Sequence, residues 1–167
     1  QIAKAIYFLE QHGVRDYNEI EARLTEKIAL IGELSAFIKE KENRLAEISV
    51  LKTHIINYSK TKEEYVSYRK SGYNKKFFEA HREEILLHKA AKQAFTELQT
   101  DKLPKVKELS AEYTQVLAEK KAAYTEYRQV KKEMQEYGIA KQDIDRFLKI
   151  DEEAQQQEKE NKKETAR

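Results

Sequence analysis

The chain has 167 residues, of which 37% are charged, with one proline, four glycines, no tryptophan and no cysteine. Without cysteine no disulfide can form, and we expect a reducing, cytoplasmic location. No run of eighteen apolar residues occurs, which excludes a transmembrane helix, and no membrane partner is expected. The few helix breakers predict an all-α fold. Because the chain opens on Gln1 without a signal-like stretch, we interpret it as a segment of a longer protein.

Residues 1–13 are predicted to form a short leading helix. Ile2, Ile6 and Leu9 have the spacing of a single helical face, and Gly13 suits the left-handed position after a helix end. This helix is the first of three predicted parts of the chain. The other two are an elongated helical coiled-coil domain over residues 14–150 and a charged, disordered tail over residues 151–167.

A long helix is predicted from Tyr17 to about Lys70. Asp16 can cap its first turn, and Glu19 can reach back as in a capping box. Apolar residues then recur at steps of three and four, the heptad pattern of a helix packed along a narrow stripe. Near Leu51 this pattern slips by three residues. The predicted seam is Tyr17, Ile20, Leu24, Lys27, Ile31, Leu34, Ile38, Lys41, Leu45, Ile48, Lys52 and Ile55, continuing after the slip through Tyr58, Lys62 and Tyr65.

A third helix is predicted over residues 75–98, capped by Asn74, with a broad apolar face suited to packing between two other helices. His81 and His88 lie at the edge of that face. They are about 10 Å apart along the axis, whereas two ligands on one helix need a spacing of three or four residues. We therefore expect partly buried histidines with polar partners, and no catalytic, metal or cofactor site.

A fourth helix is predicted to open at Pro104, with proline in its first turn. Its heptad pattern continues in phase through Gly138, which we expect to be a tolerated weak point. The predicted seam is Val106, Leu109, Tyr113, Val116, Lys120, Ala123, Tyr127, Val130, Met134, Tyr137, Lys141, Ile144 and Leu148. The tyrosines in this list, like Tyr17, are interpreted as packing residues.

These helices predict an elongated bundle in which two long helices are bridged by a shorter one. Short connections favour antiparallel neighbours, so the two long helices are expected to run parallel. Seams that one chain leaves uncovered favour a homodimer. In small-angle X-ray scattering we expect a radius of gyration well above the roughly 15 Å of a compact chain of this length, and the mass of two chains. A compact monomer would contradict both expectations.

The segment over residues 58–78 combines cations with interleaved aromatic residues. Cations contact phosphates and exposed aromatic rings stack on bases, so this composition suits single-stranded nucleic acid. The alternative is a solvated end of the bundle whose aromatic residues are core. The candidate DNA-binding residues are Lys60, Lys62, Arg69, Lys70, Tyr73, Lys75 and Lys76.

Several long blocks resemble the C-terminal region of MOB-type mobilisation relaxases of conjugative and integrative elements of Gram-positive bacteria. These blocks are "YSKTKEEYVSYRKSGYNKKFFEAHREEILLHKAAKQAF", "KLPKVKELSAEYTQVLAEKKAAYTEYRQVKKEM" and "AKQDIDRFL", preceded by "AKAIYFLEQHGVRDYNEIEARL". The resemblance covers about residues 1–150. Relaxases nick one DNA strand with a tyrosine and a histidine-bound metal in an N-terminal domain. No catalytic residue of that domain matches a position in this chain.

The resemblance implies a non-catalytic accessory region that contacts DNA at an origin of transfer, other relaxosome or transfer proteins, or a second copy of the chain. A second hypothesis is a structural coiled-coil scaffold or docking module without affinity for nucleic acid. The third hypothesis is an independent enzyme. The sequence argues against it, because the chain has no glycine-rich phosphate loop, no cysteine nucleophile and no Ser–His–acid grouping.

Overall fold

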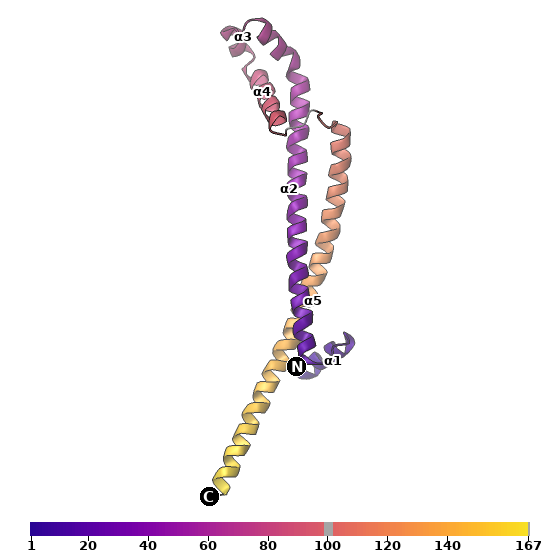
Figure 1. The fold of residues 1–167 in the computed structure, drawn as a ribbon, viewed down its shortest axis with the longest axis vertical. Helices are drawn as coiled ribbons and strands as arrows, with labels where there is room; N and C mark the ends of the chain where they lie inside the picture. The colour runs from indigo at the N-terminus through magenta and orange to yellow at the C-terminus, as the bar shows by residue number, and fades with distance from the viewer. Residues whose placement is uncertain (99–101, 167) are drawn as a thin grey trace. The chain divides into compact units, whose positions relative to one another are not determined.

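The computed structural model describes residues 1–98 and 102–166, and these are almost entirely helical, with no strand (Figure 1). The predicted all-α class with two long helices is confirmed. The chain divides into two compact units, one formed by Gln1–Ala36 with Ala123–Arg167 and the other by Phe37–Ala122. The helices in chain order are α1 (Ile2–Gln11), α2 (Tyr17–Lys70), α3 (Lys75–Ala80), α4 (Arg82–Glu97) and α5 (Val106–Thr165). Two parts of the predicted domains lie outside the described residues: residues 99–101 of the helical domain and Arg167 at the end of the tail.

The first unit packs α1 against the N-terminal part of α2 and the C-terminal part of α5. Its core consists of Ala5, Leu9, Val14, Ile20, Tyr137 and Ala140. The predicted face of α1 is wrong in one position, since Ile6 is exposed and Ala5 is buried. Gly13 has the predicted role: at φ +66° it lets the Val14 N–H reach the Leu9 carbonyl at 2.9 Å, which closes a Schellman turn.

The start of α2 follows the predicted local signals. The Asp16 carboxylate accepts from the Glu19 N–H at 2.9 Å, and Glu19 reaches back to the N–H of Arg15 instead of Asp16. Beyond the cap, the Tyr17 hydroxyl donates to Asp145 at 2.5 Å, and Lys141 bonds the other oxygen of that carboxylate. The hydrogen bond to Asp145 raises the pKa of Tyr17. Tyr17 is also half-buried and packs against the core of the first unit, as expected for a packing residue.

The seam residues of α2 and α5 are buried or half-buried nearly as predicted. Ile20, Leu34, Leu45 and Ile48 are buried on α2, and Leu109, Val116, Ala123, Val130 and Tyr137 on α5. Three of the lysines in the seam form ion pairs across the helices. In the first unit Lys27 pairs with Glu133, and in the second Lys41 pairs with Glu119 and Lys120 with Glu42.

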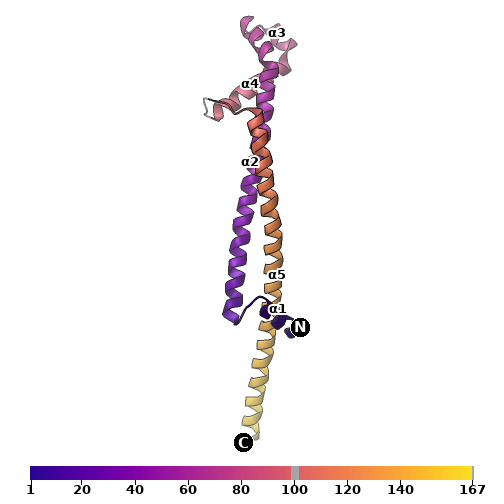
Figure 2. The ribbon, with the colours of Figure 1, turned by 90° about the vertical axis from the view of Figure 1, so that its right-hand side faces the viewer.

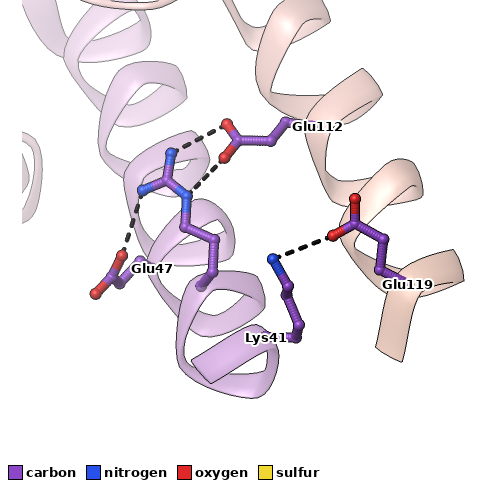
Figure 3. Close-up of polar contacts among 5 residues, drawn as sticks. Lys41, Glu47, Glu112 and Glu119 are labelled. Carbon is purple, nitrogen blue, oxygen red and sulfur yellow. Dashed lines mark hydrogen bonds and ion pairs between the residues drawn. The ribbon is translucent and has the colours of Figure 1, made fainter. Parts of the chain in front are cut away.

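The relative direction of the two long helices corrects the sequence-based expectation. In the second unit Arg44 binds Glu112 through two hydrogen bonds of 2.7 and 3.0 Å, and Lys41 meets Glu119 farther along α5 (Figure 3). Residue numbers rise on one helix as they fall on the other, so α2 and α5 are antiparallel. The same order holds in the first unit, where Tyr17 meets Asp145 and Lys27 meets Glu133.

The direction of α5 relative to α2 differs from the prediction because α4, and not α5, covers the C-terminal part of α2. Both views place α4 beside that part of α2 (Figure 1 and Figure 2). Tyr58 contacts Phe95 and Thr61 contacts His88, so α4 is also antiparallel to α2. Within the second unit, both α4 and α5 therefore run antiparallel to α2. The seam's phase slip at Leu51 separates the stretch of α2 that packs on α5 from the stretch that packs on α4.

Several predicted details of α3 and α4 are wrong. The helix expected over residues 75–98 is interrupted at His81, whose backbone leaves the helical region at φ −126° and ψ 32°. The face expected between two helices packs on one side only, so Leu86, Leu87 and Leu98 are exposed. On α2, Thr61 is buried where Lys62 was expected, because its hydroxyl has hydrogen-bond partners there and a lysine ammonium would not.

The two ends of α5 also differ from the prediction. Lys105 precedes the helix and its N–H donates to Glu108, so Pro104 lies just before the first turn. At the other end Leu148 is exposed, and α5 remains helical to Thr165, in contrast to the disordered tail expected from residue 151. Every described residue of that tail is exposed. Its helix depends on local interactions, such as Gln155 with Asp151, in a composition rich in good helix formers.

Candidate nucleic-acid interface

The candidate DNA-binding residues surround the turn between α2 and α3 in the second unit. Gly72 (φ 72°) and Tyr73 (φ 61°) both have left-handed backbones. The Tyr73 N–H donates to the Tyr68 carbonyl at 3.1 Å, so α2 also ends in a Schellman turn. Asn74 then caps α3 as predicted, accepting from the N–H groups of Lys76 and Phe77. We call residues 58–98, which include α3 and α4, the hairpin.

The structure brings the predicted cations together on the outside of the hairpin. Four lie on α2 and two on the first turn of α3, and all six are exposed: Lys60, Lys62, Arg69, Lys70, Lys75 and Lys76. Within the described part of the chain, none of them is within ion-pair distance of a carboxylate. Their charges therefore remain available to an external anion.

Three further cations of the hairpin were missed by the sequence-based selection. Arg82, Lys89 and Lys92 are exposed on α4. The Lys92 ammonium lies 5.0 Å from the Tyr65 ring centroid, and the Lys89 ammonium lies 5.7 Å from that of Tyr68. Lys89 and Lys92 are three residues apart, which places them on one side of a helix. Only the pairing of α4 with α2 brings these two lysines beside the predicted cations.

The aromatic residues of the segment are mostly packed inside the hairpin. Tyr68 is buried, and Tyr58, Tyr65, Phe77 and Phe78 are half-buried. Tyr73 differs, with 58% of its surface exposed. The same segment therefore contains both expected features. It has the cationic surface expected for nucleic-acid binding and the aromatic core expected for a solvated bundle end.

His88 lies at the centre of this aromatic core and is 2% exposed. Its ring stacks on Tyr58 and Tyr65, with centroid distances of 4.5 and 4.4 Å. The Thr61 hydroxyl donates to the Asn57 carbonyl at 2.6 Å, so its oxygen can accept from His88 Nδ1–H at 3.0 Å. The expected polar partner is confirmed for His88, which is more deeply buried than predicted.

His81 has a different environment. It is half-buried, with its ring 4.4 Å from that of Phe77, and its side chain caps no backbone N–H. Among residues 1–98 and 102–166, no three His, Cys, Asp or Glu side chains form a group that could hold a metal ion.

Acidification is expected to destabilise the hairpin through His88. Burial lowers the pKa of His88, and the charges of Lys92 and Lys62 act in the same direction. The unfolded chain therefore binds more protons, and stability falls as pH drops below about 6.5, by at most about 1.4 kcal/mol per pH unit. Unfolding free energies from pH 8 to 5 should fall more steeply for the parent than for a His88→Gln variant. Parallel curves would contradict this assignment, and a His81→Gln variant serves as the control.

Comparisons with known proteins identify no relative. No family model matches the chain, and no curated protein and no solved structure shows significant similarity to it. In the part of the chain that the structure describes, none of the helices combines the length and apolarity needed to cross a membrane.

Proposed function

We propose that this chain is a non-catalytic helical module that binds the phosphate backbone of DNA through the cations of the hairpin. The observation that carries the proposal is their lack of carboxylate partners. Residues 58–98 contain nine basic and six acidic side chains. None of the nine basic ones forms an ion pair with a described residue.

The cations of the long helices provide the contrast. Lys27, Lys41, Arg44 and Lys120 each pair with a glutamate of the opposite helix. The hydrogen bonds with Arg44 lower the pKa of Glu112, which keeps that carboxylate charged. These four cations, which link the two long helices, are thus paired with carboxylates, whereas the cations of the hairpin have no carboxylate partner among the described residues. An excess of unpaired positive charge attracts a polyanion and accelerates its association.

The biological setting that we propose is the accessory region of a conjugative relaxase, as the sequence resemblance implies. The module would hold DNA near an origin of transfer while a separate domain performs the nicking. Self-association and docking of other transfer proteins belong to the same proposal. Exposed apolar side chains on α5, including Ile139, Phe147 and Ile150, support self-association, and the mass from scattering tests it.

Charge reversal in the hairpin is expected to weaken DNA binding strongly. In Lys70→Glu/Lys75→Glu/Lys76→Glu, three phosphate contacts become repulsive. For single strands each contact contributes about −0.7 to the slope of log affinity against log salt, so six contacts give about −4 in the parent. The variant's slope should be near −2. Fluorescence anisotropy with labelled DNA across a salt series measures both quantities, and origin and random sequences should bind equally.

The matched control reverses three exposed lysines of the tail, Lys159, Lys162 and Lys163. It changes the net charge by the same amount, and its DNA affinity should stay close to that of the parent. Folding should tolerate the hairpin variant. Glutamates in the first turn of α3 are favourable by about 0.3–1 kcal/mol each, which offsets the loss of Lys70 from the last turn of α2. Equal loss in both variants would show that only net charge matters.

The second candidate function is a structural scaffold or protein-docking module. The packed aromatic core of the hairpin favours it, because that core explains most of the aromatic residues without any ligand. If the parent chain bound no DNA even at low salt, the scaffold function would replace DNA binding.

A further inference from the structure

We infer that the hairpin binds double-stranded DNA in preference to single strands. This inference rests on the proposed function and concerns the form of the nucleic acid. It reverses the preference that composition alone indicates, because the structure separates the two components of the basic, aromatic segment. The cations are on the surface, whereas most of the aromatic rings are not.

Proteins that hold single strands without sequence preference use exposed aromatic faces, on which successive bases stack. In the hairpin these faces are already occupied. Tyr58 and Tyr65 stack on the ring of His88, at interplanar angles of 22° and 18°. The Tyr68 ring contacts those of Phe77 and Phe78, with centroid distances of 6.3 and 5.8 Å. Exposing any of these rings to a base would disrupt the contact between α2 and the helices that follow it.

Tyr73 is the exception, but it cannot form a stacking platform by itself. Its ring meets Tyr68 edge-on, with centroids 5.3 Å apart, as the apolar contact of the Schellman turn. Its backbone is fixed by the hydrogen bond to the Tyr68 carbonyl. One ring offers a face to one base, whereas single-strand sites align several.

A surface that binds through cations, without a row of exposed aromatic faces, favours the ligand with the higher charge density. Lys60 and Lys70 are about 15 Å apart along α2, at 1.5 Å per residue. Duplex DNA carries one charge per roughly 1.7 Å, or about nine phosphates over that length, and one of its strands carries about half as many. Each neutralised phosphate also releases more condensed counterion from a duplex, about 0.9 against 0.7. Both effects favour the duplex.

The residue types indicate binding without sequence selectivity. Five of the six cations around the turn are lysines, which act as point charges and lack the fork that guanidinium groups use to read guanine. The contact is therefore to the sugar–phosphate backbone.

The test compares a labelled 20-base-pair duplex with one of its strands, using the full chain at a fixed low salt concentration. We expect the duplex to bind at least about fivefold more tightly, with a salt slope of about −0.9 per contact. Tyr73→Asn removes the ring and keeps a residue that tolerates the left-handed backbone, and Tyr73→Phe retains the ring as the matched control. Both variants should bind each DNA within about twofold of the parent.

Three results would overturn the duplex preference. The first is equal or tighter binding of the single strand. The second is a loss of about fivefold or more in single-strand affinity that occurs in Tyr73→Asn and not in Tyr73→Phe, which would indicate base stacking. Either result would leave the proposed DNA binding intact. Absence of binding to both DNAs at low salt would refute this preference together with the proposed function.

Discussion

Replacing Leu109 with aspartate is expected to unfold the second unit or to destabilise it by more than about 4 kcal/mol. Leu109 is 2% exposed. In the antiparallel register set by Arg44 and Glu112, it lies opposite the stretch of α2 that contains the buried Leu45 and Ile48. The variant loses the transfer free energy of a buried leucine and places a carboxylate in a buried apolar seam. Urea unfolding followed by circular dichroism at 222 nm measures the effect.

The control for this variant is Ala111→Asp, two residues along the same helix. Ala111 is exposed, and an aspartate there should change the unfolding free energy by no more than about 1 kcal/mol, mainly through its lower helix propensity. Tyr127 belongs to the same seam but is half-buried, so Tyr127→Asp should destabilise less than Leu109→Asp. If Leu109→Asp and Ala111→Asp had equal stability, the seam assignment would be wrong.

Truncating Tyr137 to alanine is expected to cost about 3–5 kcal/mol in the first unit. Tyr137 is 2% exposed and is one of the largest fully buried side chains of the described residues. Its ring contacts Phe8 of α1 at 5.1 Å and His12 at 5.6 Å, so the truncation leaves a cavity beneath α1. Thermal unfolding and hydrogen exchange at the α1 amides should both report the loss.

Tyr124→Ala provides a tyrosine control on the same helix. Tyr124 is exposed, and its ring contacts Tyr127 and the Arg128 guanidinium at the surface. Its truncation should cost less than about 1 kcal/mol, because surface contacts of this kind contribute little. A similar cost for Tyr124→Ala and Tyr137→Ala would show that Tyr137 does not anchor α1.

The candidate site was predictable in its charges but not in its aromatic residues. Every cation selected from the sequence is exposed, because a charged side chain seldom enters an apolar core without a partner. A tyrosine can be buried or exposed, and its sequence neighbours do not decide between the two. Tyr68 is buried and Tyr73 is exposed, although both belong to the same basic stretch. That difference depends on α3 and α4 folding back on α2.

The helix ends and the heptad seams follow from interactions between residues at most a few positions apart. The caps at Asp16 and Asn74, the glycine turns at Gly13 and Gly72 and the period of the seam are therefore visible in the sequence. The direction of α5 is set by packing between residues far apart in the chain, and a heptad seam is compatible with either direction. The phase slip at Leu51 is visible in the sequence, but the sequence does not explain it. In the structure, α2 contacts α5 before Leu51 and α4 after it.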